Sequence, residues 1–377
     1  MKKVWLTFTA LMVLVVVSSW LMSGLWGGKE EKIARPQQLV FTPGETINSF
    51  MEDNKIPDAV MTKALGKTAL SDKGVPLAGL LASLPLSHEQ LQTKLLKASA
   101  LVSEDAGKDW QKILPKFALW VSFLFVAFRA LTKGQLNCKT RKGYYLGAVV
   151  LFGIAFGSDP SPMGTVKDAI VLLAKEGVVF PPRIIALSAF LLTVSLANKA
   201  ICAWGCQFGV LQDLVYRLNR NKADTAGILK QYKIPFIISN GVRVGFFFTF
   251  TAVALIVGMD LVEYVDPFKT FNPAHLVITG AITSAILLVA SLFIYRPWCH
   301  FFCPFGLVSW LLERFSLNKI RVDEKACTLC GSCERACPSV VMSAILHKKK
   351  VIPDCFSCGT CAEVCPTKAI SFGQKQP

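Results

Sequence analysis

The sequence predicts a mainly α-helical membrane protein with about six transmembrane helices, an internal parallel repeat, and a small cysteine-rich α+β domain at its end. Three observations predict this fold class. The chain of 377 residues is 53% hydrophobic, with a mean hydropathy of +0.46. Several apolar runs approach or exceed the roughly 18 residues that a spanning helix needs. Twelve of the thirteen cysteines stand in tight clusters.

The charge and the cysteine usage narrow the class of protein further. The net charge of +16 is typical of basic cytoplasmic loops in a membrane protein. No basic-aromatic face or known motif indicates nucleic-acid binding, and none is expected. The segments predicted to be external contain no cysteine, so the clusters favour metal binding in a reducing compartment over a disulfide framework.

The chain is predicted to divide into four parts. Residues 1–27 form an uncleaved signal-anchor helix, because this apolar stretch is longer than the apolar core of a signal peptide. Residues 28–112 form a polar module with helical patterning, in which Thr46 and Ser87 are the expected N-caps. This module is expected to have a docking or structural role. Residues 113–316 form the membrane domain, and residues 317–377 the C-terminal domain.

The predicted spans after the first cover residues 113–131, 145–157, 184–201, 235–258 and 276–295. The loop "TKGQLNCKTRKG" carries four basic residues and no acid, and the loop after Cys206 carries five basic residues. The opposite loops balance or exceed their basic residues with acids. The positive-inside rule therefore predicts a multi-pass protein of the bacterial inner membrane, with both termini cytoplasmic and the 28–112 module periplasmic.

An internal repeat lies in the membrane domain. The segment "CAWGCQFGVLQDLVYRL" aligns with "CHFFCPFGLVSWLLERF", so that each cysteine, each Phe-Gly pair and one arginine coincide. Upstream, Asp159-Pro160 and Asp266-Pro267 occupy corresponding external loops. The repeated unit reads span, Asp-Pro loop, span, cysteine pair and amphipathic helix. Both copies have the same orientation, and such parallel repeats pack about an axis along the membrane normal.

The repeat predicts that two C-x3-C pairs meet at the cytoplasmic ends of the fourth and sixth spans. On a continuing helix, cysteines four apart share one face. Pseudo-twofold packing then gathers four thiolates, which suit a tetrahedral metal or an iron–sulfur cluster. The alternatives are buried structural thiols and a redox-active disulfide pair. The residues of this hypothesised shared site are Cys202, Cys206, Cys299 and Cys303.

The C-terminal cysteines carry the most specific signal. "CTLCGSCERACP" and "CFSCGTCAEVCP" are both complete C-x2-C-x2-C-x3-C-P runs of bacterial ferredoxins, in which the fourth cysteine ligates the other cluster. Zinc is the alternative ligand for C-x2-C pairs. Zinc binding does not require two complete runs that each end in proline, so the pattern favours iron–sulfur clusters. The expected ligands are Cys327, Cys330, Cys333 and Cys365 for one [4Fe–4S] cluster, and Cys355, Cys358, Cys361 and Cys337 for the second.

The histidines and the charged residues argue against other functions. None of the four histidines lies in the middle of a predicted span and no C-x-x-C-H motif is present, so no haem is expected. His275 stands at the external start of the last predicted span, as a helix-terminal hydrogen-bonding residue or, alternatively, as a contact to a quinone headgroup. No ionisable residue is expected inside a span, which argues against a transporter.

From about Gly143 to Phe372, the spans, the paired C-x3-C motifs and the ferredoxin tail together resemble the polytopic membrane polyferredoxin family, of the type of NapH, MauN and the membrane half of NosR. The resemblance implies quinol-linked electron transfer through iron–sulfur centres that feeds a periplasmic redox system. The chain departs from the family at Gln207, where the C-x3-C motif is usually followed by proline. It also lacks a flavin-attachment threonine motif, so flavin is not expected.

The sequence thus predicts a membrane-bound iron–sulfur electron-transfer protein that links the quinone pool to a redox partner, as a quinol dehydrogenase-type subunit of a reductase system. The expected partners are membrane lipid, quinone or quinol, and a periplasmic or membrane-bound reductase subunit. Two alternatives stay open at this point. One is a maturation factor that supplies electrons to a metalloenzyme, and the other is a redox-sensing membrane regulator.

Overall fold

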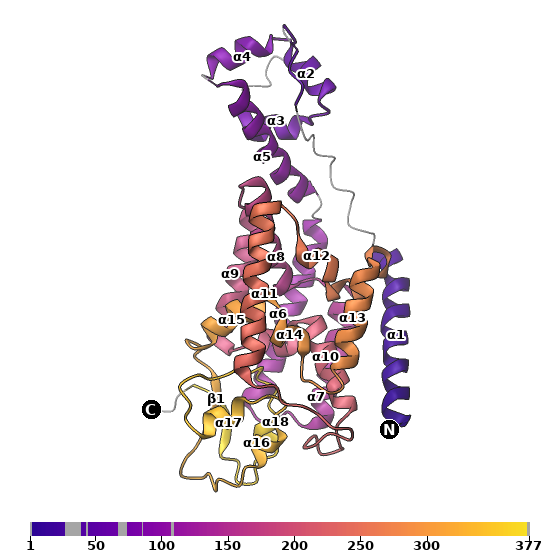
Figure 1. Ribbon diagram of the computed structural model, residues 1–377, viewed down its shortest axis with the longest axis vertical. Coiled ribbons are helices and arrows are strands. Elements are labelled where there is room, and N and C mark those ends of the chain that lie inside the picture. The colour runs from indigo at the N-terminus through magenta and orange to yellow at the C-terminus, as the bar shows by residue number, and fades with distance from the viewer. Residues whose placement is uncertain are drawn as a thin grey trace. The chain divides into compact units, whose positions relative to one another are not determined.

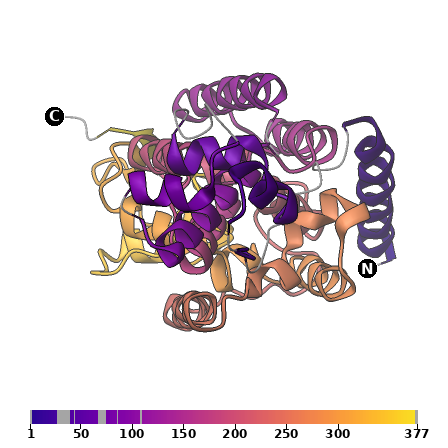
Figure 2. The same ribbon diagram turned by 90° about the horizontal axis from the view of Figure 1, so that it is seen from above.

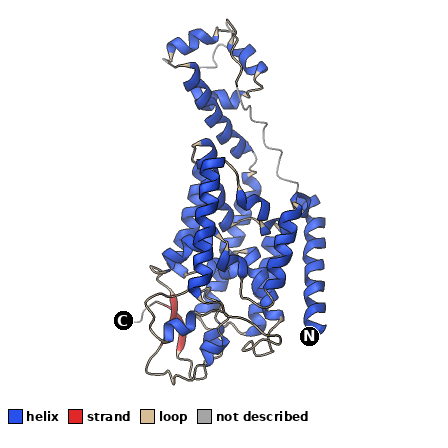
Figure 3. Ribbon diagram, viewed as in Figure 1, coloured by secondary structure: helices blue, strands red, loops and turns tan. Residues whose placement is uncertain are grey.

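The computed structural model describes residues 2–26, 39–42, 44–66, 74–84, 86–106 and 109–374, and within its first helix the side chains up to residue 23. The described chain is mainly helical (Figure 3). It forms two compact units. The larger comprises Met1–Gly28, Leu114–Val171 and Pro182–Pro377, and the smaller comprises Lys29–Ile113 and Leu172–Pro181.

The smaller unit is built from short helices that pack around an apolar core. They are α2 (Ile47–Asp53), α3 (Asp58–Leu65), α4 (Leu77–Ser83) and α5 (His88–Ala106). The backbone N–H of Ser49 donates to the Thr46 hydroxyl at 3.3 Å, which caps α2. Ser87 and Gln90 form a reciprocal capping pair at the start of α5. Both predicted N-caps are therefore confirmed.

The larger unit contains the apolar helices (Figure 1). Three helices of the described chain are long and apolar enough to cross a membrane: α1 (Lys2–Trp26), α6 (Trp110–Thr132) and α11 (Phe236–Val257). Two further apolar helices are shorter, α9 (Pro181–Ala197) and α13 (Ile278–Ala290). Viewed from above, several helices of this unit are seen nearly end-on, so their axes run in similar directions (Figure 2).

The prediction of six spans is not confirmed, because three of the predicted segments form shorter or interrupted helices. Residues 145–157 are divided between the end of α7 (Cys138–Ala148) and a π-helix, η2 (Val149–Ala155). Phe152 is fully buried there, so this apolar run lines the interior of the unit. Helix α9 ends at Ala197 because Asn198 adopts a φ of +57°, and the chain resumes as a π-helix, η3 (Ile201–Gly205).

Shorter elements connect the apolar helices and build the interior of the unit. Helix α10, the helix expected after the first cysteine pair, is buried along almost its whole length and lies in the interior of the unit. The connecting elements are α8 (Pro162–Glu176), α10 (Gln207–Leu218), α12 (Leu261–Val265), the 3-10 helices η4 (Pro267–Phe271) and η5 (Pro273–His275), α14 (Pro297–Phe301) and α15 (Pro304–Glu313).

The C-terminal residues form a small α+β fold within the larger unit. Strand β1 (Lys319–Val322) pairs antiparallel with β2 (Ile370–Gly373). Between the strands lie three short helices, α16 (Ser332–Ala336), α17 (Val341–Leu346) and α18 (Thr360–Glu363). Because the two strands hold both ends of this segment together, the two ferredoxin-type cysteine runs are folded back against each other.

Candidate iron–sulfur centres

The two ferredoxin-type runs have the same local backbone. In the first, Leu329 and Gly331 adopt positive φ angles of +54° and +69°. In the second, Ser357 and Gly359 adopt +51° and +75°. These residues flank the second cysteine of each run. A left-handed turn on both sides of a cysteine curls the loop so that successive thiols point inward, and glycine accepts this conformation without strain.

One set of four tail cysteines lines a single cavity. Its wall includes Cys337, Cys355, Cys358 and Cys361, so the fourth cysteine of the first run joins three cysteines of the second. Burial raises the pKa of the Cys361 thiol, and the neighbouring thiols of the same set raise it further. The structure thus gathers the four cysteines that the sequence assigned to the second cluster.

The other set lies nearer the surface. Burial raises the pKa of Cys333, and the thiols of Cys365 and Cys327 add to the increase, so these three are close neighbours. Cys330 is exposed, whereas Cys327 and Cys365 are partly buried. This set therefore lies closer to solvent than the set that contains Cys337.

The C-x3-C pairs occupy equivalent places in the two repeats. The second cysteine of each pair is the N-cap of the following helix, Cys206 of α10 and Cys303 of α15. The Cys303 thiol accepts the backbone N–H of Gly306 at 3.3 Å. The helix does not continue through either pair, so the expectation that each pair shares one helical face is wrong. Each pair is instead divided by a turn, with its second cysteine at the start of the next helix.

The two pairs come together in the interior of the unit. All four cysteines are buried. Burial raises the pKa of Cys303, and the thiols of Cys299, Cys206 and Cys202 raise it further, so each lies within electrostatic range of it. The four thiols are therefore buried near one another, and a shared centre at Cys202, Cys206, Cys299 and Cys303 stays a prediction.

The glycine after each pair permits this close approach. A Cβ at Gly209 would lie 3.2 Å from the Cys202 carbonyl oxygen, and a Cβ at Gly306 would lie 2.9 Å from the Cys299 carbonyl oxygen. The Phe-Gly step that aligned in the sequence thus has a packing role. It lets each capped helix fold back on the turn that holds the first cysteine of its pair.

Three buried cations surround the four-cysteine site. Arg296 donates to the backbone carbonyl of Cys202, and Arg243 donates to that of Cys299 at 3.3 Å. Lys199 donates to the carbonyl of Gly306 at 3.0 Å. Their side chains are fully buried. Cations in this position complement the negative charge that a thiolate-ligated metal centre carries.

Two carboxylates balance part of this positive charge. Asp213 accepts from Arg296 Nη2 at 2.7 Å, and it also accepts from the Tyr295 hydroxyl at 2.7 Å. Asp354 contacts Lys199 Nζ and lies 3.0 Å from Arg243 Nη1. Because Asp354 directly precedes Cys355, this ion pair joins the four-cysteine site to the buried ferredoxin-type loop.

The loop from 354 to 358 packs directly on the residues that precede both C-x3-C pairs. The Phe356 ring lies under the guanidinium of Arg296, 4.9 Å from the ring centroid, and 5.7 Å from Lys199 Nζ. The Trp204 indole N–H donates to the Ser357 carbonyl at 3.3 Å. The two cysteine sites are therefore neighbours that share one layer of side chains.

Further polar contacts fix the tail on the helices. Arg141 donates to the Cys358 carbonyl at 2.8 Å and pairs with Glu363 at 2.6 Å. Arg220 donates to the Ala336 carbonyl at 2.9 Å, next to Cys337. These contacts all reach the loops of the buried set, so the tail presents that set to the helices and turns the other set outward.

Single-ion and cluster sites differ in how far apart they hold their ligands. Within the part of the chain that the structure describes, no group of three or more His, Cys, Asp or Glu side chains is close enough to hold one metal ion. A cubane cluster holds its four thiolates farther apart than a tetrahedral ion does. All thirteen cysteines are free thiols, as such clusters require.

The sequence reasoning missed the buried cations. Lys199 and Arg296 stand three residues before the first cysteine of each pair, a correspondence that the repeat alignment would have revealed. Arg243 lies within α11, so the expectation of no ionisable residue inside a span is wrong. The pairing of Arg243 could not be predicted, because its partners, the Cys299 carbonyl and Asp354, are far away in the sequence.

Comparison with known proteins supports this organisation. A family model described as a 4Fe-4S dicluster domain matches residues 319–366. Another, described as a 4Fe-4S binding domain, matches twice, at residues 179–224 and 276–323, and each match contains one C-x3-C pair. The second model thus recognises both copies of the internal repeat.

Curated relatives cover part of the chain. The electron transport protein YccM of Escherichia coli is 29% identical over 163 residues, which are 41% of this chain and 45% of YccM. The ferredoxin-type protein MauN of Paracoccus denitrificans is 27% identical over 162 residues, 42% of this chain and 54% of MauN. MauN of Methylobacillus flagellatus is 27% identical over 148 residues, 37% of this chain and 48% of that protein.

The chain spans about half the length of these relatives. No solved structure matches. The dicluster match on the tail, the paired matches on the repeat and the named relatives agree with one another. The chain therefore carries 4Fe-4S domains of the polyferredoxin kind, binds two [4Fe–4S] clusters, and is similar over part of its length to the electron transport protein YccM and to MauN.

Proposed function

We propose that this protein passes electrons between membrane quinone and a redox partner, as a quinol dehydrogenase-type subunit of a reductase system. The observation that carries the proposal is the contact between the buried ferredoxin-type loop and the four-cysteine site, made by Asp354 and Phe356. This contact gives the apolar helices a path to the solvent-facing cysteine set, as electron transfer requires.

The proposed ligands follow the gathered sets. One cluster is held by Cys327, Cys330, Cys333 and Cys365, and the other by Cys337, Cys355, Cys358 and Cys361. We assign a third metal centre, best suited to an iron–sulfur cluster, to Cys202, Cys206, Cys299 and Cys303. Two observations support this assignment: the third set is buried, and Lys199 and Arg243 donate to backbone carbonyls around it.

The packing suggests the order in which electrons move. The four-cysteine site contacts the loop of the buried set, and the exposed set lies beyond it. The two tail sets also lie near each other, because the Cys333 thiol is one of the neighbours that raise the pKa of Cys361. Electrons would therefore pass through the four-cysteine site, then the buried cluster and then the exposed cluster, or in the reverse direction.

For the membrane, we propose six crossings with both termini in the cytoplasm and the 29–113 unit in the periplasm. Helices α1, α6 and α11 have the required length, and α9, α13 and the α7–η2 segment would complete the count. A reporter fused to the C-terminus should then be cytoplasmic, and one inserted into the 29–113 unit should be periplasmic. A periplasmic C-terminus would contradict the proposal.

The deciding experiment uses the full chain purified anaerobically. Wild-type protein should contain about twelve iron atoms, eight of them in the tail, and a short-chain quinol should bleach its visible absorbance. Replacing Cys206 and Cys303 by alanine should remove about four iron atoms and slow reduction by quinol. Dithionite should still reduce the tail clusters.

The matched control is Cys138→Ala, because Cys138 is the thirteenth cysteine and belongs to none of the three sets. It should keep all iron and the wild-type rate. If quinol does not reduce wild-type protein and quinone does not oxidise the reduced protein, the quinone link is wrong. A double variant with unchanged iron content would refute the third centre alone.

A further inference from the structure

Ser357 carries a buried hydroxyl in the loop of the second ferredoxin-type run. Its exposed fraction is 1%. It lines the same cavity as the four cysteines of the buried set, Cys337, Cys355, Cys358 and Cys361. Its hydroxyl oxygen makes no hydrogen bond to any other residue that the structure describes. A buried hydroxyl without a partner is destabilising, so this side chain requires a hydrogen-bond acceptor in the cavity.

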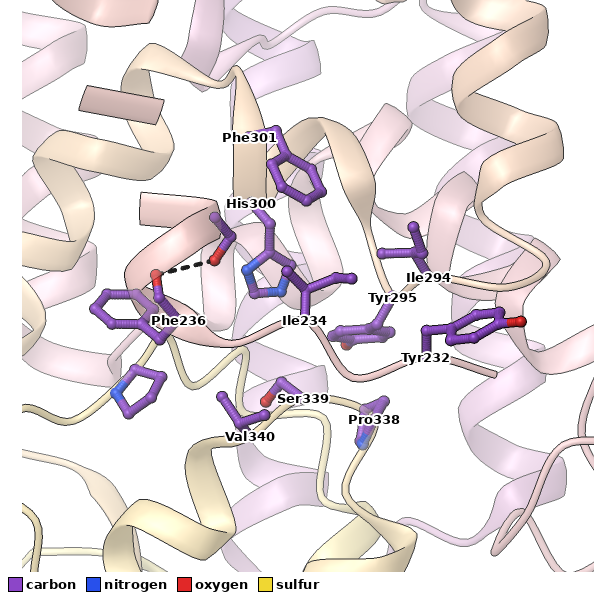
Figure 4. A pocket seen from close by; sticks show the side chains of 12 residues that line it. Tyr232, Ile234, Phe236, Ile294, Tyr295, His300, Phe301, Pro338, Ser339 and Val340 are labelled. Carbon is purple, nitrogen blue, oxygen red and sulfur yellow. Dashed lines mark hydrogen bonds between the residues drawn. The ribbon is translucent and has the colours of Figure 1, made fainter. Parts of the chain in front are cut away.

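The surrounding contacts fix Ser357 in this position. The Trp204 indole N–H donates to the Ser357 carbonyl at 3.3 Å, so the backbone of the residue is held against the helices. Figure 4 shows Pro338 and Ser339 of the tail below Tyr295, and these three residues also line the cavity of the buried set. The hydroxyl is therefore shielded from water on the side of the helices, and the acceptors within its reach are those inside the cavity.

The equivalent position of the first run differs in chemistry and in exposure. Leu329 stands there, with a φ of +54° against +51° for Ser357. Its side chain is 78% exposed and has no hydrogen-bonding group. The backbone turn is the same in both loops, so the turn itself does not require a serine. The buried set thus has a side-chain donor at a position where the exposed set has none.

Other hydroxyl groups near the tail cysteines are matched between the two sets. Each set has two serine or threonine hydroxyls that stand two residues after a cysteine and lie 3.4–3.7 Å from its sulfur. In the exposed set these pairs are Ser332 with Cys330 and Thr367 with Cys365, and in the buried set they are Ser339 with Cys337 and Thr360 with Cys358. Because these contacts occur equally in both sets, they do not distinguish the two clusters, whereas Ser357 does.

The electrostatics of the buried set give such a donor a purpose. Reduction adds one negative charge to a cluster, and burial disfavours that charge. Arg141 donates to the Cys358 carbonyl, but the carboxylates of Asp224 and Glu363 balance its charge. An O–H group directed at a cluster sulfur stabilises the reduced form and raises the reduction potential. The Ser357 hydroxyl can therefore offset part of the effect of burial without adding a buried charge.

We propose that the Ser357 hydroxyl donates a hydrogen bond to a sulfur of the buried [4Fe–4S] cluster and raises its reduction potential relative to the exposed cluster. The proposal rests on the cluster ligands given under the proposed function and adds a residue that tunes one of the two clusters. When the buried cluster takes up one electron, the proton stays on the hydroxyl and the hydrogen bond strengthens. The buried cluster then remains reducible although it lies away from water.

The test is a redox titration of the full chain, followed by EPR, with dithionite and soluble mediators. Ser357→Ala removes the hydroxyl and leaves every cysteine in place. The matched control is Leu329→Ala, the equivalent position of the other loop. Cys358→Ala identifies the EPR signal of the buried cluster, because that signal is the one it should remove. The titration requires neither quinol nor a partner, so its result is independent of the proposed quinone link.

We expect Ser357→Ala to lower the equilibrium constant for reduction of the buried cluster at least threefold, which is about 28 mV for a one-electron couple. The iron content and the potential of the exposed cluster should not change, and Leu329→Ala should match wild type. An unchanged potential of the buried cluster, or an equal shift of both clusters, would overturn the proposal and leave the quinone link standing. If Ser357→Ala loses iron, Ser357→Gly decides instead, because glycine accepts the positive φ without strain. Loss of the buried cluster in both variants would show a structural role and refute the tuning role.

Discussion

The strongest quantitative prediction concerns Asp354→Asn. Asp354 is fully buried between Lys199 and Arg243, whose side chains are also fully buried. Asparagine keeps the shape of the side chain and removes its charge. The two cations then face each other without their main counter-charge, in the layer that joins the four-cysteine site to the tail.

Removing one partner of a buried ion pair costs about 3–5 kcal/mol, because the remaining charge stays desolvated. Glu313 lies 3.9 Å from Lys199 Nζ and compensates part of the lost charge, so about 3 kcal/mol is expected. For a large folded unit, this corresponds to a fall in melting temperature on the order of 10 °C. The loss should appear first at the tail, where Asp354 stands next to Cys355.

The assay is thermal unfolding in detergent or nanodiscs, followed by cluster absorbance for the tail and by tryptophan fluorescence for the helices. The control is Glu324→Gln, which removes an exposed pair with Lys348 whose side chains are 73% and 75% exposed. Exposed pairs of this kind contribute little. If Asp354→Asn melts together with Glu324→Gln and retains both tail clusters, the buried ion pair does not hold the tail in place.

Three further predictions test other parts of the structure. Cys330→Ala should remove the exposed cluster and Cys358→Ala the buried one, and each variant should keep about four tail iron atoms. Iron analysis under anaerobic conditions and EPR distinguish the two variants. Loss of both clusters in each variant would contradict the assignment to two separate sets. Gly306→Ala should lower the free energy of unfolding by about 1–3 kcal/mol and loosen the four-cysteine site, because the added Cβ would lie 2.9 Å from the Cys299 carbonyl oxygen. The control Gly241→Ala places its Cβ in open space and should not change stability. Equal melting temperatures of the two variants would refute the packing role of Gly306. Burial raises the pKa of Asp266 to about 6. The contribution of Asp266 to the stability of the wild-type protein should therefore fall as the pH rises from about 4 to 6 and stay constant above pH 6, and Asp266→Asn should abolish that fall. Melting curves at pH 5 and 8 test the direction of this pH dependence.

The loops of the tail could be predicted from the sequence because the residues that determine each loop lie within a few positions of one another. Each cysteine run specifies its own loop, and the positive φ angles at Gly331 and Gly359 fall within the runs themselves. The exchange of the fourth cysteines, Cys337 and Cys365, follows from the same motif. The convergence of the C-x3-C pairs was predictable for a related reason, since two copies of one unit pack by symmetry.

The number of spans was less predictable, because apolar composition does not distinguish lipid from protein interior. Tyr145, Val149 and Phe152 are buried at 0–1% exposure. A hydropathy pattern treats such a segment as a span, although its apolar side chains pack against other helices. The burial of α10 was not predictable for the same reason, because its sequence includes polar residues such as Gln212 and Asp213 that the fold buries.

The charged layer could not be predicted because each pair joins distant segments. Lys199 and Asp354 are 155 residues apart, and Arg141 and Cys358 are 217 apart. In a single sequence, such residues are read as isolated loop charges. Only the packing of the tail on the helices shows that they neutralise one another away from water, where an unpaired charge would be costly.

This charged layer predicts that the tail is not a separable domain. A chain that ends after Phe315 would lose Asp354 from Lys199 and Arg243, and Glu363 from Arg141. Lys199 would keep Glu313 and Arg141 would keep Asp224. Arg243 would lose its buried carboxylate, at a cost of about 3–5 kcal/mol, so such a chain should be markedly less stable than the full chain. The full chain with all eight tail cysteines changed to serine, which keeps these ion pairs, should retain its fold better. A truncated chain as stable as that serine variant would show that the ion pairs do not hold the helices together.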